Sequence, residues 1–226
     1  MVFTLFGLIE TPLTMLAVFL AFISSLFICM PAHEFAHAHA AVREGDRTPV
    51  IAKRYTLSPI AHIDMYGFIL LLFFGIGFAK PVPVNSRNFK RGKKSSLRVA
   101  LAGVLTNLGI GVVATFIYCL IFKVWPQLFT DYGFISELYY YFLNYTISLN
   151  FMFAFFNILP IYPLDGFRVV QTFAKPGNGF VEFMRRNSYW IMLLLLIFNI
   201  LDFYIGYVAN GAASLVLKGF VALFGL

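Results

Sequence analysis

Residues 13–41 read LTMLAVFLAFISSLFICMPAHEFAHAHAA, and this stretch decides both the class of the protein and the position of its key polar residues. No charged residue occurs between Leu13 and Ala32. A helix needs about 20 apolar residues to cross the hydrocarbon core of a membrane, so the stretch predicts a membrane-spanning helix. The pattern H-E-x-x-H follows at residues 33–37, which places these polar side chains in the membrane or at its edge.

His33 and His37 are four residues apart, which places them about 40° apart around a helix, so both imidazoles can reach one metal ion. Glu34 lies beside the same ion, where it can accept a proton from a metal-activated water. Ionisable side chains at this depth are costly and mark functional sites. A chance cluster at the headgroup level is the alternative. The pattern favours a zinc-dependent peptidase that works inside the bilayer.

The composition is that of an integral membrane protein. Of the 226 residues, 60% are hydrophobic and 12% are charged, against about 25% charged residues in soluble domains. The formal net charge of +7 indicates basic cytoplasmic loops beside anionic lipid headgroups. We therefore expect the lipid bilayer as a partner, and no nucleic acid. We predict one integral-membrane domain over residues 1–226, with several membrane passes, in a prokaryotic cell membrane.

Several apolar stretches are long enough to cross a membrane. Four of them are clear, and two more are ambiguous because they could be interfacial. The clear ones are residues 13–41, 97–122, 139–164 and 188–209, and the ambiguous ones are residues 59–79 and 211–226. The sequence therefore predicts an all-α polytopic membrane protein with about four to six transmembrane helices.

Basic residues predict the orientation of these spans. They gather after the first span and at residues 80–98, where no acidic residue accompanies them. Because basic loops stay on the cytoplasmic side, we expect the histidine motif at the cytoplasmic end of the first span. Both flanks of residues 59–79 are then cytoplasmic, so this segment should enter and leave the membrane by the same face. We expect a membrane-embedded re-entrant element there, which could be a β-hairpin.

The third span ends in NILPIYPLDG at residues 157–166, near the same predicted face as the histidines. A catalytic zinc site needs three protein ligands and one open position, and Asp165 is the natural third ligand. Pro160 and Pro163 end the regular helix before it, and Gly166 permits a sharp turn after it. The alternative is that Asp165 only caps the next short helix.

Taken together, these motifs resemble the site-2 protease family of intramembrane zinc metalloproteases. His33-Glu34-Phe35-Ala36-His37 resembles the first metal motif of that family, and residues 157–166 match its N-x-x-P-x-x-P-L-D-G motif. Residues 103–107 are similar to its central G-x-x-x-N element, and residues 78–85 to a stretch that precedes it. The chain resembles a minimal member without PDZ or CBS domains, with a catalytic core at about residues 13–168 and C-terminal membrane segments at 183–226.

The resemblance implies one Zn²⁺ per chain, bound by His33, His37 and Asp165, with Glu34 as the catalytic base. It also implies hydrolysis of peptide bonds within or near transmembrane segments of other membrane proteins, with an adaptor or regulatory membrane protein as a further candidate partner. The oligomeric state stays open.

Other polar residues are weaker candidates for the site. Asn107 and Asn157 could bind substrate or stabilise an oxyanion, although a hydrogen bond between spans explains Asn107 nearly as well. His62 and Asp64 could line the entrance of the site or mark a membrane interface. Pro160 and Pro163 are expected near the site because they precede Asp165.

Two other functions are consistent with the same residues. The first is a catalytically inactive homologue that binds transmembrane partners, although binding alone does not require a base at Glu34. The second is a metal-transport protein, which would usually show repeated halves and a polar path across the bilayer. Neither feature is visible in the sequence.

Overall fold

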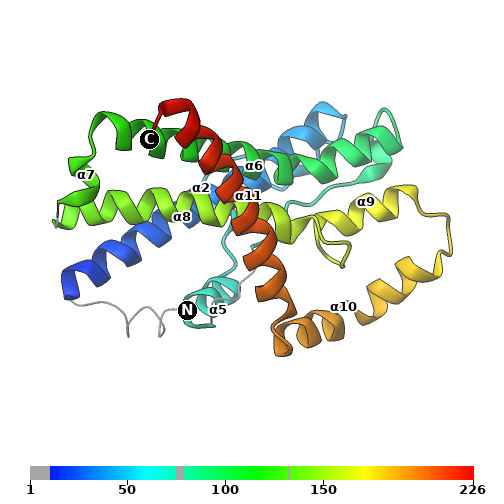
Figure 1. Cartoon of the computed structure of the whole chain (residues 1–226). Helices are drawn as coiled ribbons and strands as arrows, with labels where there is room; N and C mark the ends of the chain where they lie inside the picture. Colours follow the sequence, from blue (N-terminus) through cyan, green and yellow to red (C-terminus); the bar gives the residue numbers. More distant parts are fainter. Residues whose placement is uncertain (1–10, 75–78, 132) are drawn as a thin grey trace.

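The computed structural model describes residues 11–74, 79–131 and 133–226, and its described elements are helices (Figure 1). Its principal helices are α2 (Pro12–Arg43), α5 (Met65–Phe74), α6 (Lys93–Val124), α8 (Phe134–Asn157), α9 (Asp165–Phe173), α10 (Gly179–Ile197) and α11 (Ile200–Phe224). Short helices occur at α3 (Thr48–Ile51), α4 (Pro59–His62), η1 (Ser86–Asn88) and α7 (Gln127–Thr130). This confirms the predicted all-α class.

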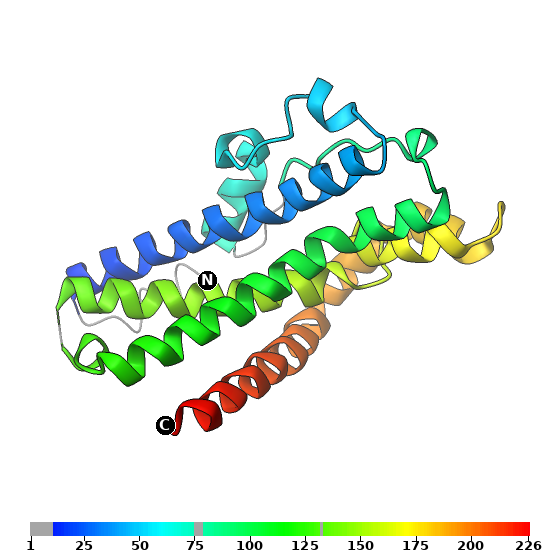
Figure 2. The same cartoon turned by 90° about the horizontal axis from the view of Figure 1, so that it is seen from above.

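Helices α2, α6 and α8 pack against one another and form the core of the molecule, as the view from above shows (Figure 2). Helix α2 begins at Pro12, and the side chain of Thr11 caps it by accepting a hydrogen bond from the Thr14 N–H at 3.2 Å. Three of the described helices are long and apolar enough to cross a membrane, namely α2, α6 and α11. The first two correspond to the predicted spans at residues 13–41 and 97–122.

Helix α8 lies beside these two helices but ends at Asn157, not at residue 164 as the third predicted span did. Residues 158–164 form turns instead of helix. Pro160 and Pro163 explain the difference, because proline lacks the N–H that a helix needs and its ring clashes with the preceding turn. The prediction placed the end of this helix too far along the chain, because it rested on apolar composition alone.

The fourth predicted span, residues 188–209, is wrong as a single helix. It is broken between α10 and α11, where Asn199 has a positive φ of 54°. Asparagine tolerates this left-handed backbone better than most residues and therefore often ends helices. Helix α11 includes most of the ambiguous stretch at residues 211–226. It packs across α6 and α8, and the rings of Phe116 on α6 and Phe220 on α11 are 5.5 Å apart (Figure 1).

The described ends of the segment at residues 63–79 lie side by side. Ile63 and Ala79 form an isolated antiparallel bridge, and the Lys80 N–H donates to the His62 carbonyl at 2.8 Å. Between them the described residues form helix α5, so the predicted β-hairpin is wrong there; residues 75–78 lie outside the described part. Asp64 caps α5 by accepting from the Gly67 N–H at 3.0 Å, which favours helix over strand. A re-entrant path through the membrane stays a prediction.

Glu44 joins the end of α2 to the start of α6. Its buried carboxylate accepts hydrogen bonds from Ser95 Oγ at 2.5 Å, from Arg91 Nη2 at 2.6 Å and from Arg98 Nη1 at 3.0 Å. The hydrogen bond from Ser95, with those from the two arginines, lowers the pKa of Glu44 from 4.5 to about 2 despite its burial. Because α6 lies over the histidine motif, this contact helps to set the register of the two helices.

The Glu44→Gln variant tests this contact through pH. A carboxyl group whose pKa is lower in the folded state stabilises the protein above its unfolded pKa, and this stabilisation is lost as the pH falls through the folded pKa. At pH 7 we therefore expect a lower thermal unfolding midpoint for Glu44→Gln than for the wild type. The difference should shrink between pH 4.5 and about 2.

Glu182→Gln is the matched control, because Glu182 is exposed on α10. An exposed carboxylate contributes little to stability, so this variant should follow the wild type across the whole range. A Glu44→Gln midpoint equal to that of the wild type at pH 7 would contradict the role given to Glu44.

Candidate metal centre

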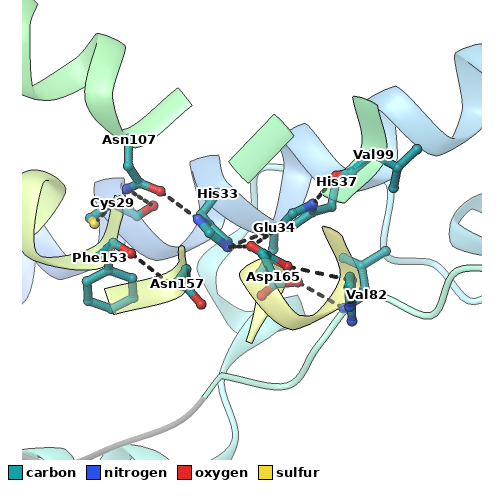
Figure 3. A network of polar contacts seen from close by, with 11 residues as sticks. Cys29, His33, Glu34, His37, Val82, Val99, Asn107, Phe153, Asn157 and Asp165 are labelled. Carbon is teal, nitrogen blue, oxygen red and sulfur yellow. Dashed lines mark hydrogen bonds and ion pairs between the residues drawn. The ribbon is translucent and has the colours of Figure 1, made fainter. Parts of the chain in front are cut away.

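Three buried side chains meet where α2, α6 and α9 come together (Figure 3). His33 and His37 lie on successive turns of α2, and Asp165 is the first residue of α9. Asp165 Oδ2 lies 3.1 Å from His33 Nε2 and 2.9 Å from His37 Nε2. The two Nε2 atoms are 3.1 Å apart. The predicted trio is thus brought together as a group that could hold a metal ion.

The opposite ring nitrogens of both histidines have hydrogen-bond acceptors. His33 Nδ1 lies 2.6 Å from Asn107 Oδ1, and His37 Nδ1 lies 2.7 Å from the carbonyl oxygen of Val99. Carbonyl oxygens cannot donate, so both Nδ1 atoms carry the hydrogen and both Nε2 atoms point their lone pairs toward Asp165. Three electron-pair donors in contact require a cation between them, either a proton or a metal ion. This donor set fits zinc, which is commonly bound by imidazole and carboxylate.

Asp165 carries the negative charge of the group. Burial raises the pKa of its carboxyl, but imidazoles that carry a proton at Nε2 would donate to it and bear positive charge, and this lowers the pKa more, so it lies below its usual range. Arg168 lies one turn further along α9, with its Nη1 3.8 Å from Asp165 Oδ1. The carboxyl is therefore an anion at neutral pH, as a ligand for a cation must be.

Two glycines permit the close approach of the chain around the group. A Cβ atom on Gly103 of α6 would lie 2.5 Å from both His33 Cε1 and His37 Nε2. A Cβ atom on Gly166 would lie 1.9 Å from the carbonyl oxygen of Ile158. Both distances are far below van der Waals contact. Gly103 therefore lets α6 pass over the imidazoles, and Gly166 lets the turn after α8 fold back and present Asp165.

Glu34 is half-buried on the same turn of α2 as His33, and its carboxylate is held by the main chain of another segment. Its Oε2 accepts a hydrogen bond from the Val82 N–H at 2.9 Å (Figure 3). Val82 belongs to the segment after the Ile63–Ala79 bridge, which has no regular secondary structure. The main chain of the segment after the bridge thus positions the predicted base.

The two candidate amides have different surroundings. Asn107 is fully buried, and its Nδ2 donates to Asn150 Oδ1 at 2.8 Å and to Cys29 Sγ at 3.0 Å. Its N–H groups therefore point away from the cluster, as the packing alternative requires. Asn157 is half-buried at the end of α8, where its Nδ2 donates to the Phe153 carbonyl at 2.9 Å. A substrate or oxyanion role stays a prediction for both residues.

The remaining candidates lie outside the trio. His62 is fully buried, and its Nε2 lies 2.8 Å from the Thr56 carbonyl oxygen. Asp64 caps helix α5, which is a structural role. Pro160 and Pro163 are exposed in the turns before Asp165. The structure therefore shows a backbone contact for His62, a cap for Asp64 and loop positions for the two prolines.

Three contacts of the site come from residues outside the motifs that predict it. Val99 and Val82 act through main-chain atoms, which no residue pattern reveals. Asn150 contacts Asn107 and is 0% exposed. One signal was available for Asn150, because a polar side chain in a membrane helix usually has a partner inside the protein.

Comparison with known proteins shows the family to which the chain belongs. The chain is 33% identical over 202 residues to the Bacillus subtilis protein named "Putative zinc metalloprotease YwhC", which covers 88% of this chain and 90% of that protein. The chain belongs to the zinc metalloprotease family of YwhC. No protein-family model matches the chain, and no solved structure matches it either.

Two archaeal proteins of Methanocaldococcus jannaschii are also similar to this YwhC-family chain. One, named "Putative zinc metalloprotease MJ0611", is 32% identical over 55% of the chain and 61% of its own length. The other, named "Zinc metalloprotease MJ0392", is 24% identical over 78% of the chain and 42% of its own length. The relatives are thus bacterial and archaeal, and the names of all three include zinc.

The Gly103→Ala variant tests the close approach of α6 to the imidazoles. Its methyl group must displace both rings, and overpacking of this kind costs about 1–3 kcal/mol. We expect about 10-fold to 100-fold weaker zinc binding, measured by competition with a chelator in detergent. Gly109→Ala is the matched control on the same helix, because a Cβ atom there meets nothing within 4 Å. Equal zinc affinity in both variants would contradict the geometry described here.

Proposed function

We propose that this YwhC-family protein is an intramembrane zinc metalloprotease of the site-2 protease type. The observation that carries the proposal is the burial of His33, His37 and Asp165 between apolar helices, with Glu34 on the same turn as the first histidine. A soluble peptidase has no need to place such a group among helices that are long and apolar enough to cross a membrane. The proposed reaction is hydrolysis of peptide bonds within or near transmembrane segments of other membrane proteins.

Each residue of the site has a separate role in the proposed reaction. His33, His37 and Asp165 would hold one Zn²⁺ ion, which supplies Lewis acidity toward water and toward the carbonyl of the scissile peptide bond. Glu34 accepts the proton of the attacking water and delivers it to the leaving amine. The Val82 N–H keeps the Glu34 carboxylate in place through Oε2. The hydrogen-bonded Nδ1 atoms keep the imidazoles from turning.

A transmembrane helix hides its peptide bonds in its own hydrogen bonds, so a substrate must unwind locally before it is cut. This requirement selects substrates with weak helices near the site. We place the site toward the cytoplasm, because the basic residues of the chain gather after α2 and before α6. An adaptor or regulatory membrane protein is a further proposed partner, since the described loops between the helices are short.

Two other functions remain as outcomes of the test. An inactive homologue would bind transmembrane partners and keep the metal without cutting. A metal transporter would need further sites along a path through the bilayer. Among the described residues, His33, His37 and Asp165 form one group of this kind, and no second group is found. A single buried group with a neighbouring carboxylate favours catalysis over transport.

The first experiment compares the wild type with Glu34→Gln. Each protein is purified in detergent, its zinc is counted, and it is incubated with model transmembrane substrates of differing helix strength. We expect one zinc per chain in both proteins. Cleavage should fall by about 10²-fold to 10⁴-fold in Glu34→Gln, because general acid–base catalysis contributes that much. Glu182→Gln, the same change at an exposed position, should cleave like the wild type.

The outcomes separate the candidate functions. Zinc in the wild type without cleavage of any substrate would favour the inactive homologue. Zinc uptake into proteoliposomes that persists in Glu34→Gln would favour the transporter. If neither purified protein holds zinc, the metal site itself is refuted.

A further inference from the structure

A line of buried side-chain hydrogen bonds leads from His33 into the interior of the helix bundle. Asn107 Oδ1 lies 2.6 Å from His33 Nδ1, and Asn107 Nδ2 donates to Asn150 Oδ1 at 2.8 Å. Asn150 Nδ2 in turn donates to the main-chain carbonyl of Thr146 at 2.7 Å. Both amides are 0% exposed. The line therefore connects α2, through α6, to the backbone of α8.

The direction of this line is set at its far end. The Thr146 carbonyl can only accept, so the amide of Asn150 must turn its NH₂ group toward it and its oxygen toward Asn107. Asn107 must then turn its NH₂ group toward Asn150 and its oxygen toward His33. His33 must donate from Nδ1, and its Nε2 is left with a lone pair toward Asp165. Each hydrogen bond in this line therefore fixes the orientation of the next side chain.

His37 reaches the same state by a shorter route. Its Nδ1 donates directly to the main-chain carbonyl of Val99 at 2.7 Å. His33 has an amide in that place, and an amide can turn over and offer either a donor or an acceptor. Asn107 is therefore a reversible group next to His33, and Asn150, whose own amide is oriented by the Thr146 carbonyl, decides which way it faces.

We propose that Asn150 is a positioning residue of the metal site, which acts through Asn107 to hold His33 in the state that binds the metal. The inference rests on the proposed zinc binding by His33. Without Asn150, the Asn107 NH₂ group keeps only Cys29, with its Sγ at 3.0 Å and its carbonyl oxygen at 3.4 Å. These contacts are weak, because sulfur is a poor acceptor and the carbonyl contact is long. The amide of Asn107 then turns over more easily and presents its NH₂ group to His33.

The first test is the zinc affinity of Asn150→Leu, which keeps the approximate size of the side chain and removes its polar atoms. Loss of an outer-shell partner of a metal ligand typically weakens metal binding 10-fold to 100-fold. Because Asn150 acts one residue further out, we expect about a 10-fold loss in affinity, at the lower end of that range. Thr115→Val is the control, because Thr115 is equally buried on α6 and donates to Gly111 within its own helix. It should bind zinc like the wild type.

A double-mutant cycle shows whether Asn150 acts through Asn107. Asn107→Leu should weaken zinc binding at least as much as Asn150→Leu does. In the Asn107→Leu background, Asn150→Leu should then have no further effect on affinity, because the residue that transmits it is gone. If the two losses instead multiply, Asn150 supports the fold in general and the proposal is overturned.

An NMR measurement on the zinc-loaded protein provides the second readout, with ¹⁵N-labelled histidine at the 4 histidine positions. The Nδ1–H protons of His33 and His37 should both be far downfield because of their short hydrogen bonds. In Asn150→Leu the His33 signal should move upfield, whereas the His37 signal should stay, since its acceptor is the main chain. Equal movement of both signals, or of neither, would overturn the proposal.

The failure of this inference is distinguishable from failure of the proposed function. If the wild type binds no zinc, the metal site is wrong and the cycle has no reference. If the wild type binds zinc and Asn150→Leu binds it equally well, the metal site stands and the role of Asn150 is refuted.

Discussion

The central constraint on this molecule is that two imidazoles and a carboxylate pack in direct contact inside an apolar helix bundle. Buried polar atoms without partners are costly, and electron-pair donors in contact are costlier still unless a cation lies between them. The residues around the cluster satisfy this constraint in two ways. Glycines admit the neighbouring backbone, and the far side of each imidazole has an acceptor. The geometry of the site and the packing of the helices therefore depend on each other.

The metal-binding candidates could be predicted from the sequence because their chemistry needs particular residue types at particular spacings. Imidazoles at His33 and His37, with a carboxylate at Asp165, are a pattern that few other functions require. The first two long helices were equally predictable, because long apolar stretches have few alternatives. The fourth predicted span was wrong because hydropathy averages over a window and overlooks a local break, such as the one at Asn199.

The remaining features depend on tertiary structure. The hydrogen bond between Glu34 and Val82 joins two segments 48 positions apart, and it uses an N–H that every residue except proline has. The role of Asn150 depends on which way Asn107 turns, and that is decided by neighbours on two other helices, α2 and α8. The same holds for residues 59–79, where apolar residues are compatible with either strand or helix until the ends of the segment are placed.

Several functional contacts of the site end on main-chain atoms, and this has a consequence for how tolerant the protein is to substitution. The acceptors for His37 and Asn150 are carbonyl groups at positions 99 and 146, and the donor to Glu34 is the N–H at position 82. Exchange of those side chains leaves the atoms in place. A systematic alanine survey would therefore record Val82 and Val99 as packing residues only. Proline at position 82 is the exception, because it alone removes the N–H. Of the nineteen possible substitutions at this position, only proline would therefore reveal the importance of this contact for catalysis.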